Sequence, residues 1–471
     1  MANMLFKNVR IENRTELSDV LVSAGKIARI TPAGSETARV DNSAAPAGNN
    51  AAPASNGTAP ESGSAASESA GATQTSQTSQ TLQATQTAES PQAPETTVYD
   101  ARGQLMLPPI VESHVHLDTT MTEGDPRSNS SGTLFEGIEI WAERKQQLTV
   151  ADVKERALRA IRQQVRFGVQ YIRSHVDVTD PELTALRALI ELREELRDTV
   201  TLQLVAFPQE GIESYPRGRE LLRQAAELGA DAIGAIPHYE FTREYSVSSL
   251  QYAFALAQEY GLLMDVHCDE IDDPASRGLE TLATLAYEAG VGEKVTASHT
   301  TAMHSYNNAY FGKLLRLLRM SGINFVSNPM VNTHLQGRID TYPKRRGVTR
   351  VPELTAAGIN VSFGQDDIVD PWNPLGTGSL RDVTLIGLYV TQMMGAEQID
   401  NSYRFITYNG ARTLHVPEAE YGIAEGKPAN FLLLDAPSWR EALMFHAPVL
   451  ASYREGRLLY EATAPTRHWH F

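Results

Sequence analysis

"QLMLPPIVESHVHLD", residues 104–118, has the apolar composition of a buried β-strand and ends in two histidines separated by one valine. Side chains alternate between the two faces of a strand, so His114 and His116 are expected to point the same way, about 6–7 Å apart along the chain. Two imidazoles at one strand end can bind the same metal ion. The competing interpretation is that both are polar residues on a solvated face, and the rest of the chain must discriminate between the two.

Composition narrows the class of the protein. The chain has 471 residues, of which 42% are hydrophobic, and a formal net charge of −16. The length suits one large domain with a smaller partner, and the acidity argues against a surface for nucleic acid or for an anionic membrane. Cys268 is the only cysteine, so no internal disulfide can form, which fits a cytoplasmic location. We expect neither a signal peptide nor a transmembrane helix, because no apolar run approaches about 18 residues.

Residues 33–97 differ in composition from the rest of the chain. They consist mainly of Ala, Ser, Thr, Gln, Pro and Gly, with almost no large apolar side chain. Such a segment cannot bury enough apolar surface to offset the entropy of ordering, and we predict a disordered low-complexity insertion. The segments on either side read as short alternating strands. Because the entropy of loop closure grows only logarithmically with length, a strand pair can tolerate such an insertion.

Residues 98–412 repeat a pattern of strand, loop and helix. The helical segments have apolar residues at a 3.6-residue period, and several end in glycine. The eight candidate strands are residues 105–118, 169–178, 200–209, 231–241, 262–270, 294–300, 323–329 and 359–367. Eight such repeats favour an α/β fold of the closed (β/α)8 barrel type over an open doubly wound sheet. Residues 1–32 and 413–471 are expected to form a small β-sandwich from both chain ends.

Residues capable of chemistry follow seven of the eight candidate strands. In (β/α)8 barrels the active site lies at the C-terminal ends of the strands. The residues at these ends are His114 and His116, His175 and Asp177, Gln209, His238 and Glu240, His267, Asp269 and Glu270, His299, and Asp366 and Asp367. Any one of these histidines can be a packed core residue. Together they predict a convergent metal site.

The expected ligands of that site are His114, His116, His267 and Asp366. Imidazole and carboxylate ligands suit Zn²⁺ or Fe²⁺, and a water molecule can take a further position and lose a proton at neutral pH. His299 and Asp366 can hold and orient that water, and Glu270 is positioned to shuttle protons. The fourth strand end, "AIGAIPHYEF", has no lysine that could bridge two ions after carboxylation. The sequence therefore favours one divalent metal ion.

Four motifs, "HVHLD", "HCDE", "SHTTAMHSYN" and "GQDDIVDPWNPLG", resemble those of the amidohydrolase superfamily. Within it, the chain closely resembles the bacterial cytosine deaminases of the barrel type. Further segments that carry the resemblance are "GTLFEGIEIWAERK", "VAFPQEGI", "AIPHYEFTREY", "VSNPMVNTHLQGR" and "DTYPKRRG". The resemblance covers nearly all of residues 100–415. The single motif H-x-H is weakly specific, whereas the complete ordered set is highly specific.

The resemblance implies a function and a role for individual residues. It implies hydrolytic deamination of cytosine to uracil and ammonia, by attack of a metal-bound hydroxide on C4, and a homo-oligomer that uses Fe²⁺ or Zn²⁺. Glu270 would protonate the ring nitrogen, and His299 would activate or orient the hydroxide. Gln209 would read the ring carbonyl and a ring N–H. The remaining residues expected around the base are Asp367, Trp372 and Leu134.

One position departs from the pattern of these deaminases. A histidine is expected before the Asp366–Asp367 pair, and this chain has Gln365. The substrate can therefore be a related cyclic amidine, such as isocytosine, a 5-substituted cytosine, isoguanine or creatinine. A ring-opening amidase is disfavoured because the bridging lysine is missing. A non-catalytic homologue that only binds metal is disfavoured because all the expected metal ligands and the proton shuttle are present.

Overall fold

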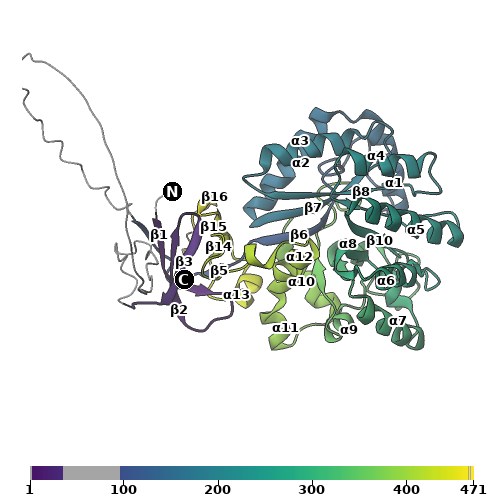
Figure 1. Ribbon diagram of the computed structural model, residues 1–471. Helices are drawn as coiled ribbons and strands as arrows, with labels where there is room; N and C mark the ends of the chain where they lie inside the picture. Colours follow the sequence, from purple (N-terminus) through teal and green to yellow (C-terminus); the bar gives the residue numbers. More distant parts are fainter. Residues whose placement is uncertain (1–2, 36–95, 465, 467, 471) are drawn as a thin grey trace, which may run out of the picture.

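The computed structural model describes residues 3–35, 96–464, 466 and 468–470. It has two parts, a barrel of parallel strands surrounded by helices and a separate sheet built from both ends of the chain (Figure 1). The predicted disordered insertion, residues 33–97, lies almost entirely outside the described residues. Within the described segments, no helix combines the length and the apolarity needed to cross a membrane.

The barrel consists of eight parallel strands in sequence order. They are β6 (Ile110–Val115), β7 (Val169–Asp177), β8 (Thr201–Phe207), β9 (Ala232–Ile233), β10 (Leu263–Cys268), β11 (Val295–His299), β12 (Asn324–Ser327) and β13 (Val361–Phe363). The barrel closes where Val115 pairs with Asp366. The N–H of His116 donates to the carbonyl of Asp366 (3.0 Å), and the N–H of Asp366 donates to the carbonyl of His114 (2.8 Å). The predicted (β/α)8 fold is confirmed, and its closing seam passes through three of the expected metal ligands.

Helices cover the outside of the barrel and follow the predicted periodicity. The α-helices are α1 (Leu134–Arg144), α2 (Val150–Arg166), α3 (Thr184–Leu196), α4 (Gly218–Leu228), α5 (Arg243–Tyr260), α6 (Gly278–Ala289), α7 (Asn308–Ser321), α8 (Pro329–Leu335), α9 (Val351–Ala356), α10 (Leu380–Thr391), α11 (Ala396–Asp400), α12 (Tyr408–Thr413) and α13 (Trp439–Met444). Short 3₁₀ turns are η2 (Lys145–Gln147), η3 (Gly292–Lys294), η4 (Thr301–Ser305), η5 (Ser402–Ile406) and η6 (Glu418–Glu420). Helix α4 ends at Gly229, whose φ of 116° is open to glycine but disfavoured for other residues. The apolar face of each long helix packs on the barrel strands. These strands are buried on both faces, and in β7 all nine residues are buried.

The second sheet joins the two ends of the chain. Its order is β16-β15-β14-β5-β1-β2-β3, with β4 beside β1. These strands are β1 (Asn3–Ile11), β2 (Leu17–Ser23), β3 (Lys26–Pro32), β4 (Thr96–Asp100), β5 (Leu105–Leu107), β14 (Phe431–Leu434), β15 (Val449–Arg454) and β16 (Arg457–Glu461). The ring of Phe6 lies 5.0 Å from that of Phe431 and 5.1 Å from that of Tyr453, between centroids. The small β-sandwich expected from both chain ends is present as one continuous sheet that packs around its own core.

The transition between the two sheets lies at Pro108 and Pro109. The predicted strand 105–118 divides there, because two successive prolines lack the N–H groups that a continuous ladder needs. Residues 105–107 pair with β1 and β14 in the end sheet, and the first barrel strand begins at Ile110. The strand predicted at 231–241 is also shorter, because only Ala232 and Ile233 pair with both neighbouring strands.

Candidate metal centre and active site

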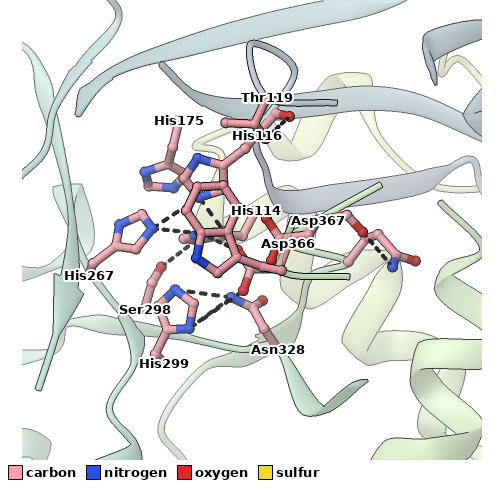
Figure 2. Close-up of polar contacts among 12 residues, drawn as sticks. His114, His116, Thr119, His175, His267, Ser298, His299, Asn328, Asp366 and Asp367 are labelled. Carbon is pink, nitrogen blue, oxygen red and sulfur yellow. Dashed lines mark hydrogen bonds and ion pairs between the residues drawn. The ribbon is translucent and has the colours of Figure 1, made fainter. Parts of the chain in front are cut away.

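Four side chains from three parts of the barrel rim converge at one point. Their potential ligand atoms all lie within 4.8 Å of one another, and the four residues are His114, His116, His267 and Asp366. The Nε2 atom of His267 lies 3.2 Å from Nε2 of His114 and 3.1 Å from Nε2 of His116. The Oδ1 atom of Asp366 lies 3.3 Å and 3.5 Å from the same two histidine atoms. Figure 2 shows these imidazoles and the carboxylate turned toward one another.

The spacing of the cluster fits a bound metal ion. Ligand bonds of about 2.0–2.2 Å, at angles between about 90° and 110°, keep neighbouring ligand atoms about 2.8–3.5 Å apart. The observed separations of 3.1–3.5 Å fall in this range. Two neutral imidazole nitrogens at this distance can form at most one hydrogen bond with each other. A metal ion, in contrast, can bind the lone pairs of all three imidazoles at once. Three imidazoles and one carboxylate are a donor set suited to Zn²⁺ or Fe²⁺.

Burial prepares these groups for a cation. Desolvation lowers the pKa of His114 to about 3 and the pKa of His267 well below its ordinary value, so both rings are neutral and keep a lone pair. Burial alone would raise the pKa of Asp366, but the charge of His299 and the polar contacts with His114 and His116 lower it, and the group is a carboxylate. For His116 burial is likewise outweighed, because hydrogen bonding to Asp366 raises its pKa.

Glu270 and His299 form a second group beside the ligands. The Oε1 atom of Glu270 lies 3.1 Å from Nδ1 of His299 and accepts a hydrogen bond from Nδ2 of Asn332 (3.0 Å). The same His299 nitrogen lies 3.8 Å from Oδ2 of Asp366. Burial would lower the pKa of His299, but the carboxylates of Glu270 and Asp366 raise it to about 9. An imidazole with two carboxylates near one nitrogen can orient a water molecule and exchange protons.

Two of these residues have an uncommon backbone conformation. His299 and Asp366 have φ values of 65° and 69°, in the left-handed region that residues with a side chain seldom adopt. Such conformations cost on the order of 1 kcal/mol or more and cluster at functional sites. Here each one turns the chain sharply at the end of its strand, which directs the side chain across the mouth of the barrel.

A pocket opens beside the metal ligands. It is lined by His116, His267, Asp366, Glu270 and His299, by the predicted substrate residues Gln209, Asp367, Trp372 and Leu134, and by Ile138, Ile236, His238 and Leu335. The indole N–H of Trp372 donates to the carbonyl of Leu134 (3.1 Å) and so joins the loop after β13 to the first residue of α1. The structure thus brings the predicted metal ligands, acid–base residues and substrate residues to one pocket or to the metal cluster beside it. The other strand-end candidates Asp177, Glu240 and Asp269 belong to neither.

Sequence reasoning missed several residues of this site. Asn332 contacts Glu270 and His299, and its only signal was its position within "VSNPMVNTHLQGR", a segment that carries the family resemblance. Three apolar wall residues, Ile138, Ile236 and Leu335, cannot be distinguished in sequence from ordinary core residues. His175, a candidate from its strand end, does not join the four ligands and instead stacks on His114 with centroids 3.8 Å apart.

Gln365 lies beside the metal ligands but does not line the pocket. Its side-chain amide donates to the backbone carbonyl of Asp367 (3.1 Å), and its backbone N–H donates to the buried carboxylate of Glu112 (3.0 Å). The same Glu112 oxygen accepts the N–H of His114 (3.1 Å). Through these hydrogen bonds Gln365 stabilises the loop that carries Asp366 and Asp367. Unlike the histidine expected at this position, its side chain does not titrate.

Comparison with known proteins gives consistent results. Residues 97–460 match the sequence model of the amidohydrolase family. The 5-methylcytosine deaminase of Klebsiella pneumoniae, solved with 5-fluorocytosine or phosphonocytosine, is 45% identical, with a TM-score of 0.84 over 99% of this chain and 99–100% of the other. The N-isopropylammelide isopropyl amidohydrolase of Pseudomonas sp. (strain ADP) is 30% identical over 76% of this chain and 87% of that protein. A pterin deaminase of Rhizobium rhizogenes is 27% identical over 76% of this chain and 82% of its own length.

Proposed function

The chain belongs to the amidohydrolase family, and from this premise we propose that it hydrolytically deaminates cytosine to uracil and ammonia. The observation that carries the proposal is one small pocket lined by three members of the His₃Asp cluster, by an acid–base pair and by an amide. These are the groups that replacement of an amino group by water on a planar ring requires. The 45% identical structure of a 5-methylcytosine deaminase supports the same class of substrate.

His114, His116, His267 and Asp366 would hold one divalent ion, Fe²⁺ or Zn²⁺. A bound ion of this kind lowers the pKa of a water molecule from about 15.7 to about 7, which makes a nucleophile available at neutral pH. His299, with Asp366 at 3.8 Å, would keep the attacking oxygen in line with C4 of the base by donating one hydrogen bond. The oxygen atom that attacks C4 becomes the O4 atom of uracil.

Glu270 would move the protons. Its carboxyl group would take one proton from the attacking water and pass it to ring N3, which makes C4 more electrophilic. It would then take the second proton of that water and pass it to the amino group as the C4–N4 bond breaks. One water molecule is consumed and one ammonia molecule is released for each base. Asn332 donates to Glu270 Oε1 and would hold the carboxyl group in the orientation that reaches both nitrogens.

Recognition of the base would rest on Gln209 at one edge and on apolar walls. The primary amide of Gln209 can pair with a ring carbonyl and an adjacent ring N–H at once, and a base without that edge would leave a buried amide unpaired. Leu134, Trp372 and Leu335 also line the pocket, and these apolar side chains suit a substituent on the ring. This observation favours 5-methylcytosine as the second candidate substrate.

The proposal is tested by loading the purified chain with Fe²⁺ or with Zn²⁺ and measuring ammonia release. The panel is cytosine, 5-methylcytosine, isocytosine, isoguanine and creatinine. We expect the two cytosines to be turned over with the highest kcat/KM. Turnover of none of them, or of creatinine alone, would contradict the proposal. A homo-oligomer, a cytoplasmic location and the domain limits at residues 32, 97 and 412 stay predictions from the sequence.

A further inference from the structure

The interior of the barrel beneath the metal cluster contains a series of buried polar side chains that are linked by hydrogen bonds. Ser298 on β11, Asp265 on β10 and Arg173 on β7 are each at most 1% exposed. The Oγ atom of Ser298 lies 3.0 Å from Nδ1 of His114 and donates to Oδ1 of Asp265 at 2.6 Å. Nη1 of Arg173 donates to Oδ2 of Asp265 at 2.8 Å. Figure 2 shows Ser298 below the ring of His114, on the side away from Asp366.

We propose that Ser298 and Asp265 are positioning residues that hold His114 in the one tautomer able to bind the metal. The inference rests on the metal site of the proposed function and extends it to residues that touch neither the ion nor the substrate. It assigns them a contribution to metal affinity through the orientation and the proton of one imidazole.

The direction of the hydrogen bonds carries the argument. A serine hydroxyl has a single hydrogen, and Ser298 gives it to the carboxylate of Asp265, which can only accept. Toward His114 the hydroxyl oxygen is left as an acceptor, so the hydrogen between them must be on Nδ1 of the histidine. The Nε2 atom of His114 then carries a lone pair, and that atom faces His267 and Asp366.

Arg173 holds Asp265 in place at the far end of this hydrogen-bonded series. Its guanidinium also donates to the side-chain carbonyl of Gln203 (2.6 Å) and to the backbone carbonyl of Thr413 (2.9 Å). A buried carboxylate between a guanidinium and a hydroxyl has little freedom to rotate. The nearest other titratable group, Nε2 of His175, is 3.8 Å from Asp265 Oδ2, which is beyond hydrogen-bond distance.

The ligand His267, on β10, is held differently. Nδ1 of His267 has no hydrogen-bond partner among the described residues, and its ring stacks on Phe207 with centroids 3.9 Å apart and planes 19° apart. Stacking fixes the plane of a ring but not the position of its proton. The polar chain therefore makes His114 the ligand whose tautomer the protein specifies.

The alternative is that Arg173, Asp265 and Ser298 only fill the barrel. The substitution Ser298→Ala separates the two interpretations, because it cuts the link to His114 and leaves the ion pair of Arg173 and Asp265 in place. Ser362→Ala is the matched control. Ser362 is also a fully buried serine on a barrel strand, and its hydroxyl contacts Phe325 and Thr413 rather than a ligand.

The experiment titrates Zn²⁺ into the metal-free full-length chain against a competing chelator at pH 7.5. Loss of an outer hydrogen bond to a metal ligand typically weakens binding 10–100-fold, so we expect a loss of about that size for Ser298→Ala and a change of less than about twofold for Ser362→Ala. Equal affinity of Ser298→Ala and the wild type would overturn the inference. Equal losses in Ser298→Ala and Ser362→Ala would also overturn it, since both would then reflect packing.

A second measurement reads the tautomer of His114 directly in the wild-type protein. ¹⁵N spectra of histidine-labelled wild-type protein report which ring nitrogen carries the hydrogen, with His114 assigned through His114→Gln. We expect the Nδ1–H form for His114 in the metal-free protein, and the Nε2–H form would overturn the inference. Both measurements are independent of substrate. A chain that binds Zn²⁺ but releases no ammonia would overturn the proposed activity alone, whereas a wild type that binds no Zn²⁺ would overturn both.

Discussion

The mouth of the barrel and the sheet formed by the chain ends bury opposite kinds of side chain. At the mouth, His114, His267 and Asp366 are at most 4% exposed. In the end sheet, the core consists of apolar and aromatic residues around Phe6 and Phe431. The rings of His175 and His267 at the barrel centre each have a nitrogen without a hydrogen-bond partner among the described residues, whereas the end-sheet rings pack in edge-on and stacked pairs.

This difference separates stability from function. Burial of apolar area favours folding directly, and buried polar groups with unfilled hydrogen-bonding capacity oppose it. The barrel mouth keeps such groups because they are arranged to receive a cation and a polar ring. We therefore expect substitutions in the two regions to affect different measurements, and the four experiments below test that expectation in order of decreasing effect.

Glu270→Gln tests the barrel mouth. The amide keeps the size of the side chain but cannot carry the proton, so we expect kcat to fall about 10²–10⁴-fold. Metal content, measured by atomic absorption, and the thermal midpoint should equal those of the wild type, because Glu270 is not one of the four clustered ligands. Turnover within tenfold of the wild type would remove Glu270 from the mechanism.

Phe6→Ala tests the end sheet. Phe6 is 1% exposed and contacts three aromatic rings, so its truncation should lower the free energy of unfolding by about 3–5 kcal/mol in urea titrations. At 25 °C the kcat of the folded fraction should not change. Val98→Ala is the control in the same sheet, because Val98 is 58% exposed and should change stability by less than about 0.5 kcal/mol. A large loss of kcat in Phe6→Ala would show that the two regions are coupled.

Gly137→Ala tests how closely α1 must pack against Trp372 in the wall of the pocket. A Cβ at this position in α1 would lie 2.3 Å from Nε1 of Trp372, so the indole must shift and its hydrogen bond to Leu134 must change. We expect kcat/KM to fall about 10–100-fold with little loss of stability. Gly312 in α7 is the matched helical glycine, since a Cβ there meets no atom within 4 Å. Gly312→Ala should keep full activity. Equal activity of both variants would show that close packing of α1 against Trp372 is not needed for catalysis.

Replacement of residues 36–95 by a ten-residue Gly–Ser linker should have the smallest effect. Pro32 lies level with Val9 of β1, and Thr96 lies level with Asn3, so the ends are about 25 Å apart and a ten-residue chain can span them. Closing a loop about six times shorter should stabilise the protein by about 1.5 kcal/mol at unchanged kcat. A fall in kcat would give the segment a part in the reaction, which its composition does not suggest.

Much of this architecture follows from local sequence pattern. Apolar runs of strand length alternate with 3.6-period helices, and that alternation predicts a parallel barrel because a crossover helix must pack on the strands it joins. The period of two along a strand predicts that His114 and His116 share a face. The position of His267, His299 and Asp366 at other strand ends predicts convergence, because the strands of a barrel end at a common rim.

Tertiary structure decided what depends on contacts between distant segments. The hydrogen bonds that close the barrel join His114 and His116 to Asp366, and no local pattern specifies the register of that seam. The division of the predicted strand at Pro108 and Pro109 is seen only in the structure, where β5 pairs with β14. Similarly, the chain from Ser298 through Asp265 to Arg173 crosses three strands, so its members are ordinary polar residues until the barrel places them in line. Local propensity is encoded over a few residues, whereas the energies that orient a metal ligand arise between residues far apart in the chain.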